Sequence, residues 1–259
     1  MPLGESRSET GVVTLTLDNP ERRNALDLEM AAALRDAAAR VASDPSVRCV
    51  VVTGAGSSFC SGADLGKLRS AADGVLPQRE LLTSYYRAFL DLRDLAAPTV
   101  AAVNGPAIGA GLNLALCCDL RIAAASARFG ATFVRLGIHP GGGATHMLVR
   151  LLGPARAADL LLTGRLVDAD ESLSLGLVNR VVPDAELTAA AAELASRIAE
   201  GAPLAVRATK RALRIAIDAD FDAVLEVEAL AQAATQQSDD AAEGWTAFWE
   251  RRTPQFKGR

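Results

Sequence analysis

The 259-residue sequence has few aromatic side chains and only two histidines. Aromatic residues make up 4% of the chain, so the core must be built largely from Ala, Leu and Val, a composition that favours helices. The sequence contains no run of about 18 apolar residues, and we therefore expect no membrane-spanning segment. A net charge of −4 argues against a general nucleic-acid binder, which needs a basic face.

Cysteine is also scarce, and its spacing does not suggest a metal site. Cys49, Cys60, Cys117 and Cys118 lie in apolar or glycine-rich surroundings. These features are typical of reduced, small core residues, and the N-terminus has no apolar signal core. We therefore expect a cytoplasmic protein without a bound metal.

Strands and helices are expected to alternate in the first half of the chain. Four β-rich stretches predict strands at residues 11–18, 49–53, 99–103 and 119–123. Helical periodicity predicts helices over 24–42 and 81–95 and a short helix from about 109. This alternation predicts βαβ units with parallel strands.

The second half is expected to be mainly helical, with one short strand at 177–182. The helices are predicted over 142–152, 154–163, 168–175, 184–200, 203–217, 221–236 and 239–251. Residues 66–80 are rich in Gly, Ser, Asp and Pro and are expected to form a loose surface loop.

Two glycine-rich segments, 54–65 and 102–113, are the most informative part of the sequence. Each is a bend that follows a β-branched apolar run, so its backbone N–H groups are free to face a ligand. Two such bends brought together aim two donors at one oxygen, which is the design of an oxyanion hole. The alternative is two tight turns required only for packing.

These segments resemble those of the crotonase (enoyl-CoA hydratase/isomerase) superfamily, and the similarity extends from residues 19–26 to 248–256. The resemblance implies an α/β fold of the ClpP/crotonase type. A spiral of βαβ units would occupy residues 1–195. A helical C-terminal region, 196–259, would pack on the core and on neighbouring subunits in a trimer or dimer of trimers. The implied ligand is an acyl-CoA or enoyl-CoA thioester of fatty-acid metabolism, with no cofactor apart from the coenzyme A of the substrate.

The resemblance also assigns roles to individual residues. The oxyanion-hole donors would be the backbone N–H groups of Ala63 and Ala110. Substrate-binding positions are implied at Arg22, Arg23, Ala25, Ser61, Asp64, Leu65, Ile108, Gly109, Phe133, Phe248 and Arg251. The last two lie on a C-terminal helix that often comes from a neighbouring subunit, and the arginines would meet phosphates.

The three positions where family members carry a catalytic acid are not acidic in this chain. They are occupied by Asn113, Phe133 and Gly141. An amide cannot accept a proton at neutral pH, so two-carboxylate hydration is not expected. His139 is the weak candidate for a replacement base, against a structural role in the turn before Pro140. Two function classes remain open: an acyl-CoA enzyme of unusual chemistry, and a non-catalytic acyl-CoA-binding protein.

Two other patterns are interpreted as structural. Asp119 follows an apolar helix and begins a strand, which favours a buried structural or capping carboxylate. The glycines at 54 and 56 lack the third glycine of a dinucleotide fingerprint, because Phe59 occupies that position.

Overall fold

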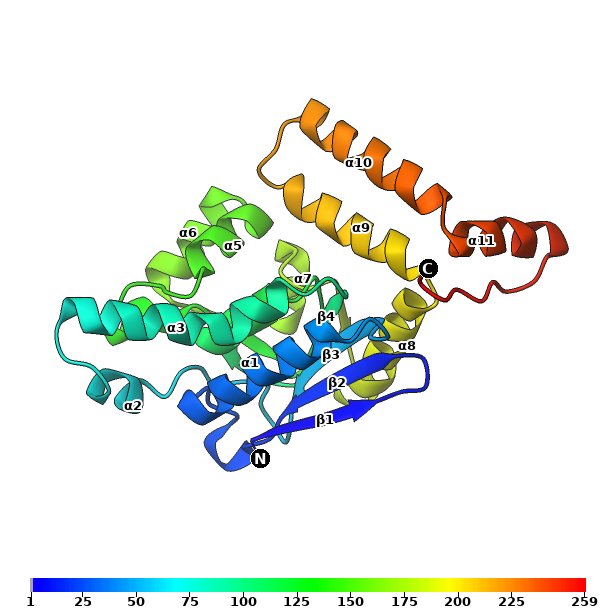
Figure 1. Ribbon diagram of the computed structural model, residues 1–259. Coiled ribbons are helices and arrows are strands. Elements are labelled where there is room, and N and C mark those ends of the chain that lie inside the picture. The colour runs from blue at the N-terminus through cyan, green and yellow to red at the C-terminus, as the bar shows by residue number, and fades with distance from the viewer. Residues whose placement is uncertain (1) are drawn as a thin grey trace.

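A six-stranded sheet runs through the computed structural model, which describes residues 2–259 (Figure 1). In spatial order its strands are β1 (Leu3–Arg7), β2 (Val12–Leu17), β3 (Cys49–Gly54), β4 (Thr99–Val103), β6 (Leu120–Ala124) and β9 (Arg180–Val182). The β1–β2 pair is antiparallel, and each later neighbouring pair is parallel. The expectation of βαβ units with parallel strands is confirmed.

Helices connect and cover these strands. In chain order they are α1 (Leu28–Ser43), α2 (Leu65–Ser70), α3 (Val75–Arg93), α4 (Ala110–Cys117), α5 (Ala144–Leu152), α6 (Pro154–Thr163), α7 (Ala169–Leu175), α8 (Leu187–Ala199), α9 (Pro203–Ile215), α10 (Phe221–Gln236) and α11 (Asp239–Glu250). Three short 3₁₀ turns are η1 (Pro20–Arg22), η2 (Thr132–Leu136) and η3 (Asp184–Glu186). A second, three-stranded sheet has the order β5 (Ala107–Ile108), β7 (Arg128–Gly130), β8 (Leu166–Asp168).

The central strands are buried on both faces because helices pack on each side. Val50 and Val52 of β3 join the core formed with α1, α3 and α4. Val51, which points to the opposite face of the same strand, packs with residues of α8. This two-sided burial explains the continuous apolar run that marked β3 as a buried strand.

The first helix begins later than the sequence pattern predicted. Arg23 and Asn24 have positive φ angles of 50° and 54°, so the chain there is left-handed rather than helical. Asp27 then caps α1 by accepting a hydrogen bond of 3.0 Å from the Met30 N–H. The predicted start at residue 24 was therefore wrong by four positions.

The expectation of a loose loop over residues 66–80 was also wrong. Helix α2 covers its beginning, and α3 starts at Val75 instead of residue 81. Pro77 lies in the first turn of α3, where a missing N–H breaks no hydrogen bond of the helix. Pro77 therefore belongs to the start of a helix, whereas its presence in the sequence favoured a loop.

The three C-terminal helices extend away from the sheet. In Figure 1, α10 lies alongside α9, and α11 lies at the opposite end of the molecule from α2. The chain end returns to the core, where the Arg48 guanidinium donates to the Phe256 carbonyl at 2.7 Å. The division at residues 195 and 196 falls inside α8 and stays a prediction. Within residues 2–259, no helix has both the length and the apolarity needed to cross a membrane.

Candidate active site

The two glycine-rich bends lie side by side and are hydrogen-bonded to each other. They follow β3 and β4, which are parallel neighbours, so both bends leave the same edge of the sheet. The Cys60 N–H donates to the Pro106 carbonyl at 3.0 Å, and the Ile108 N–H donates to the Cys60 carbonyl at 3.0 Å. These bonds fix the position of one bend against the other.

Glycine is required where α4 meets the first bend. A methyl group on Gly111 would overlap the Cys60 carbonyl oxygen and lie 2.8 Å from its carbon. Gly109, just before the helix, has φ = 54° and ψ = −115°, a conformation that side chains disfavour. These two glycines let the start of α4 lie directly on the backbone of the first bend.

Ala63 and Ala110 present two backbone N–H groups that have no acceptor among residues 2–259. The Leu26 N–H donates to the Gly62 carbonyl at 2.8 Å and the Asp64 N–H donates to the Leu26 carbonyl at 3.2 Å, so the intervening Ala63 N–H faces away from Leu26. Ala110 is the first residue of α4, where an N–H has no partner within the helix. A methyl group placed on Gly62 would lie 3.8 Å from the Ala110 nitrogen, which shows that the two donors are close.

Asn113 lies one turn beyond Ala110 on the buried helix α4. Its Nδ2 donates to the Gly141 carbonyl at 2.8 Å. Its Oδ1 is buried, and no described residue donates a hydrogen bond to it. A buried acceptor without a donor is costly, so this oxygen is free for a group that the chain itself does not supply.

Phe133 and Gly141 complete the set of residues near the start of α4. Phe133 is half-buried, and a methyl group on Gly109 would lie 3.9 Å from its ring carbon Cζ. Ile108, also half-buried, precedes Gly109 in β5. His139 is exposed and makes none of the side-chain hydrogen bonds found among the described residues. The structure therefore brings Asn113, Phe133 and Gly141 together but does not anchor His139 to them.

Tyr86 on α3 is a neighbour of this site that the sequence reasoning missed. A methyl group on Gly141 would overlap the Tyr86 hydroxyl oxygen and lie 3.0 Å from its Cζ carbon. Burial raises the pKa of Tyr86, and a hydrogen bond from the Gly142 backbone partly opposes this rise. The adjacent Tyr85 points into the core and donates to the Leu26 carbonyl at 2.8 Å. Because Tyr85 and Tyr86 are adjacent, the sequence alone does not reveal which of them faces the site.

The side of the site that carries Arg22 and Arg23 is charged. The Arg22 guanidinium lies 3.3 Å from a carboxylate oxygen of Asp64 and 3.7 Å from one of Asp27. Its positive charge is therefore partly neutralised. Arg23 is exposed and forms no ion pair within residues 2–259. It is the arginine of this pair that is more available to an anionic ligand.

Asp27 and Lys67 extend this charged cluster. The Lys67 ammonium lies 3.3 Å from Asp27. Burial raises the pKa of Asp27, but the Met30 N–H, Lys67 and Arg22 together outweigh it, and the pKa falls below its usual value. The carboxylate is thus held ionised at the start of α1.

The remaining implied substrate-binding residues on this side form hydrogen bonds with the local backbone. The Ser61 N–H donates to the Arg23 carbonyl at 3.0 Å, and Asp64 caps α2 by accepting from the Lys67 N–H at 3.2 Å. Ala25 is half-buried nearby in sequence. The side chain of Leu65 lies outside the described residues.

Phe248 and Arg251 are not close to this site within one chain. Both belong to the end of α11, at the opposite end of the molecule from α2 in Figure 1. Phe248 is 68% exposed. Its ring packs edge-on against that of Trp249, with 5.4 Å between the ring centroids. Contact with a ligand at Ala63 and Ala110 would require a second copy of the chain to supply these two residues.

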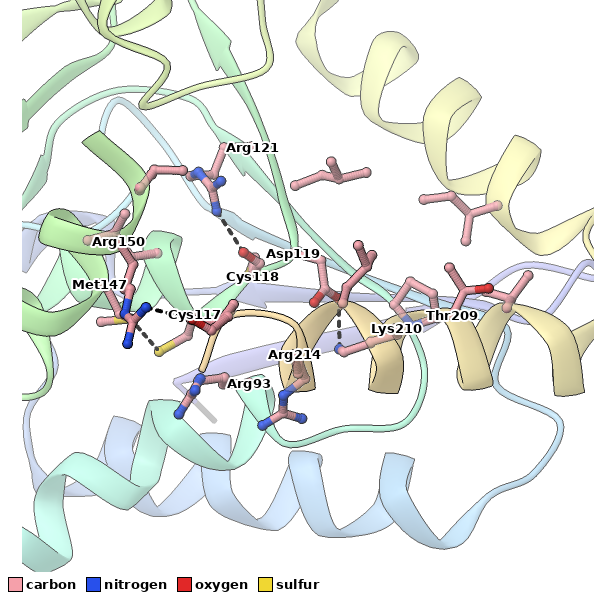
Figure 2. A pocket seen from close by; sticks show the side chains of 18 of the residues that line it. Arg93, Cys117, Cys118, Asp119, Arg121, Met147, Arg150, Thr209, Lys210 and Arg214 are labelled. Atoms are coloured by element: carbon pink, nitrogen blue, oxygen red, sulfur yellow. Dashed lines mark hydrogen bonds and ion pairs between the residues drawn. The ribbon is translucent and has the colours of Figure 1, made fainter. Parts of the chain in front are cut away.

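A cavity of about 790 Å³ lies elsewhere, between α9 and the C-terminal end of α4 (Figure 2). Asp119 and Lys210 line it, and their charged groups are 2.7 Å apart. Asp119 also accepts from the Thr99 N–H at 2.7 Å. These bonds tie α9 to β4, which supports the structural interpretation of Asp119, although its side chain is only partly buried.

The four cysteines are all buried and free. Burial raises the pKa of the Cys60 thiol to about 12, so it is not a reactive thiolate at neutral pH. Among residues 2–259, no three His, Cys, Asp or Glu side chains are arranged so that they could hold a metal ion.

The family model for enoyl-CoA hydratase/isomerase matches residues 7–259. This chain belongs to the enoyl-CoA hydratase/isomerase family. A crotonyl-CoA hydratase of Syntrophomonas wolfei is 38% identical over 249 residues, which are 96% of this chain and 95% of that protein.

Two further relatives support the same family assignment. A probable enoyl-CoA hydratase of Mycobacterium tuberculosis is 46% identical over 203 residues, 78% of each chain. The crystal structure of an enoyl-CoA hydratase from Bacillus anthracis superimposes with a TM-score of 0.95 at 36% identity, and the match covers 100% of both chains. The expected crotonase-like fold is therefore confirmed.

Proposed function

We propose that this chain binds coenzyme A thioesters and polarises the thioester carbonyl between the N–H groups of Ala63 and Ala110. The observation that carries the proposal is the pair of neighbouring backbone donors without acceptors, at the start of a buried helix. Family membership and the enoyl-CoA hydratases among its relatives support a thioester as the ligand. In such a site each donor to a developing oxyanion contributes about 3–4 kcal/mol.

The positions around the hole favour a chemistry other than two-carboxylate hydration. Asn113 can hold a water molecule but cannot take its proton, and Phe133 offers only an apolar surface. The loss of one general acid or base typically costs a factor of about 10²–10⁴ in rate. A non-catalytic acyl-CoA-binding protein is the second candidate, and the same two residues favour it.

The rest of the ligand would be held by charges and by another subunit. Arg23 is an exposed cation beside the first bend that forms no ion pair within the described residues, and Arg22 adds a partly neutralised one. In this proposal Phe248 and Arg251 contact coenzyme A only from a neighbouring copy, within a trimer or a dimer of trimers. No cofactor is required beyond the coenzyme A of the substrate. The four free, buried cysteines fit a cytoplasmic location.

Hydration and binding can be measured separately on the same protein. We expect crotonyl-CoA hydration to be at least about 10³-fold slower than for the Syntrophomonas wolfei relative assayed in parallel. Calorimetry should still detect crotonyl-CoA binding, and added salt should weaken it because phosphate contacts are screened. Turnover within tenfold of that relative would reject the proposed loss of hydration. Absence of any acyl-CoA binding at high protein concentration would reject the thioester site itself.

A further inference from the structure

The Tyr86 hydroxyl occupies the space into which a side chain at position 141 would project. Gly141 has no side chain, and a methyl group there would overlap the hydroxyl oxygen of Tyr86. The two residues come from different elements, since Tyr86 is on α3 and Gly141 lies just before α5. The phenol therefore places a polar, proton-bearing group where the loop itself carries none.

This hydroxyl is connected to the oxyanion hole through a short series of contacts. The Gly141 carbonyl accepts a hydrogen bond from Asn113 Nδ2 at 2.8 Å. Asn113 follows Ala110 by three positions on α4, so both residues lie on the same face of the helix. The unpartnered Oδ1 belongs to the same Asn113 side chain that donates to Gly141. Gly141 thus lies between the Tyr86 hydroxyl and Asn113, which is one helical turn beyond Ala110.

The hydroxyl is also free to act. The Gly142 backbone N–H faces the hydroxyl oxygen as a donor, but no described residue accepts the hydroxyl proton. The Tyr86 side chain is only half-buried. Partial burial raises the pKa of Tyr86, so the phenol carries its proton at neutral pH. A neutral phenol is a proton donor to a carbanion rather than a base.

We propose that Tyr86 is the group that donates a proton to the α-carbon of a thioester enolate held by Ala63 and Ala110. The inference rests on the proposed function. In this step the enolate electron pair forms a C–H bond at the α-carbon while the O–H bond of Tyr86 breaks. The thioester carbonyl re-forms, and the resulting phenolate takes a proton from water. The site then suits enoyl thioesters that are attacked by a nucleophile needing no base from the protein.

A thiol provides such a nucleophile, because a fraction of it is ionised in solution. The test uses crotonyl-CoA and 2-mercaptoethanol in D₂O with the full chain. The thiolate sulfur bonds to the β-carbon, the C=C electron pair moves to form the enolate, and Tyr86, with its hydroxyl deuterated, delivers deuterium to the α-carbon. We expect the wild type to accelerate the addition over the uncatalysed rate and to deuterate one face.

Two variants and one control separate proton donation from structure. Tyr86→Phe should slow the addition by at least about 100-fold and remove the facial selectivity. Its Tm should change little because the hydroxyl is half-buried and gives its proton to no described acceptor. Gly141→Ala, whose methyl group displaces the hydroxyl, should act in the same direction. Tyr85→Phe deletes a hydroxyl from the same helix and should lower Tm while keeping rate and selectivity.

The outcomes distinguish this inference from the proposed function. If crotonyl-CoA binds but the wild type gives no acceleration, or Tyr86→Phe keeps rate and selectivity, the role of Tyr86 is wrong and the thioester site stands. Equal losses in Tyr86→Phe and Tyr85→Phe would also overturn it. If calorimetry detects no binding of crotonyl-CoA, both proposals are wrong.

Discussion

Helices α4 and α10 are both rich in apolar residues, yet their surroundings in the chain are opposite. Every residue of α4 is buried, whereas α10 has no buried residue. Helix α4 lies in the core and its neighbours include α3, α5 and β5. Helix α10 contacts α9 and α11 and leaves Phe221, Leu225 and Leu230 at least 50% exposed.

The comparison shows that one chain fully covers α4 but leaves α10 exposed. Burial on all sides fixes the start of α4, so the Ala110 N–H has a defined position without a ligand. The exposed apolar side chains of α10 have no such cover within the described residues, and exposed apolar surface of this kind is typical of a subunit interface. It supports the proposed oligomer, in which a second copy also brings Phe248 and Arg251 to the site.

The largest effect is expected from the tight contact beneath α4. In Gly111→Val the new side chain overlaps the Cys60 carbonyl, which belongs to buried backbone and cannot move aside. We expect a loss of at least about 2–3 kcal/mol in the free energy of unfolding, measured by urea denaturation. Gly66→Val is the control for loss of a helical glycine, because this residue of α2 is exposed, has no positive φ, and an added methyl group would contact only Asp64 Oδ1 at 3.6 Å. Similar losses in both would show that α4 is not tightly packed.

A smaller effect is expected from α10, and it should appear in assembly rather than in folding. Leu225→Glu combined with Leu230→Glu replaces two exposed apolar side chains of α10 with charges, and each leucine would contribute about 1.5–3 kcal/mol when covered. Sedimentation should show a lower molar mass, while circular dichroism stays unchanged. Gln232→Glu, an exposed position on the same helix, is the charge control. An unchanged molar mass in the double variant would place the subunit interface elsewhere.

The smallest effect concerns the attachment of the chain end to α11. The Arg252 guanidinium and the Gln255 N–H lower the pKa of Glu243 to about 2. Because this folded pKa lies below the unfolded value of about 4.3, the stabilisation is present above that value and is lost as pH falls towards 2.

Trp245 and Trp249, the only two tryptophans, both lie on α11 and report this change. Their fluorescence should shift between about pH 4 and pH 2, before far-UV circular dichroism shows loss of the core. Glu243→Gln should weaken or remove that early step. If the shift persists unchanged in this variant, another group controls the chain end.

Part of the fold and of the candidate site could be predicted from the sequence. The apolar runs before residues 54–65 and 102–113 predicted β3, β4 and the bends that follow, because strand and turn signals are local. The resemblance then identified Ala63 and Ala110 as candidate donors. The short strands β1, β5, β7 and β8 were not predicted, since two to five residues form a strand only through pairing with distant partners.

The missing site features also depend on tertiary contacts. Tyr86 is next to Tyr85 in sequence, and only the packing of α3 decides which hydroxyl reaches Gly141. The closer of the two carboxylates that partly neutralise Arg22 belongs to Asp64, which is 42 positions away. Neither contact leaves a local pattern that could have been recognised in advance.

The proposed function depends on polarisation of a thioester carbonyl by the Ala63 and Ala110 N–H groups. The most direct measurement is the infrared carbonyl stretch of ¹³C-labelled butyryl-CoA, free and bound. We predict a shift to lower frequency on binding to the wild type and to Ala110→Gly, and a smaller shift with Ala110→Pro, which lacks this N–H but is tolerated at a first helical position. An unshifted carbonyl in the bound wild type, or equal shifts in both variants, would contradict the oxyanion-hole assignment.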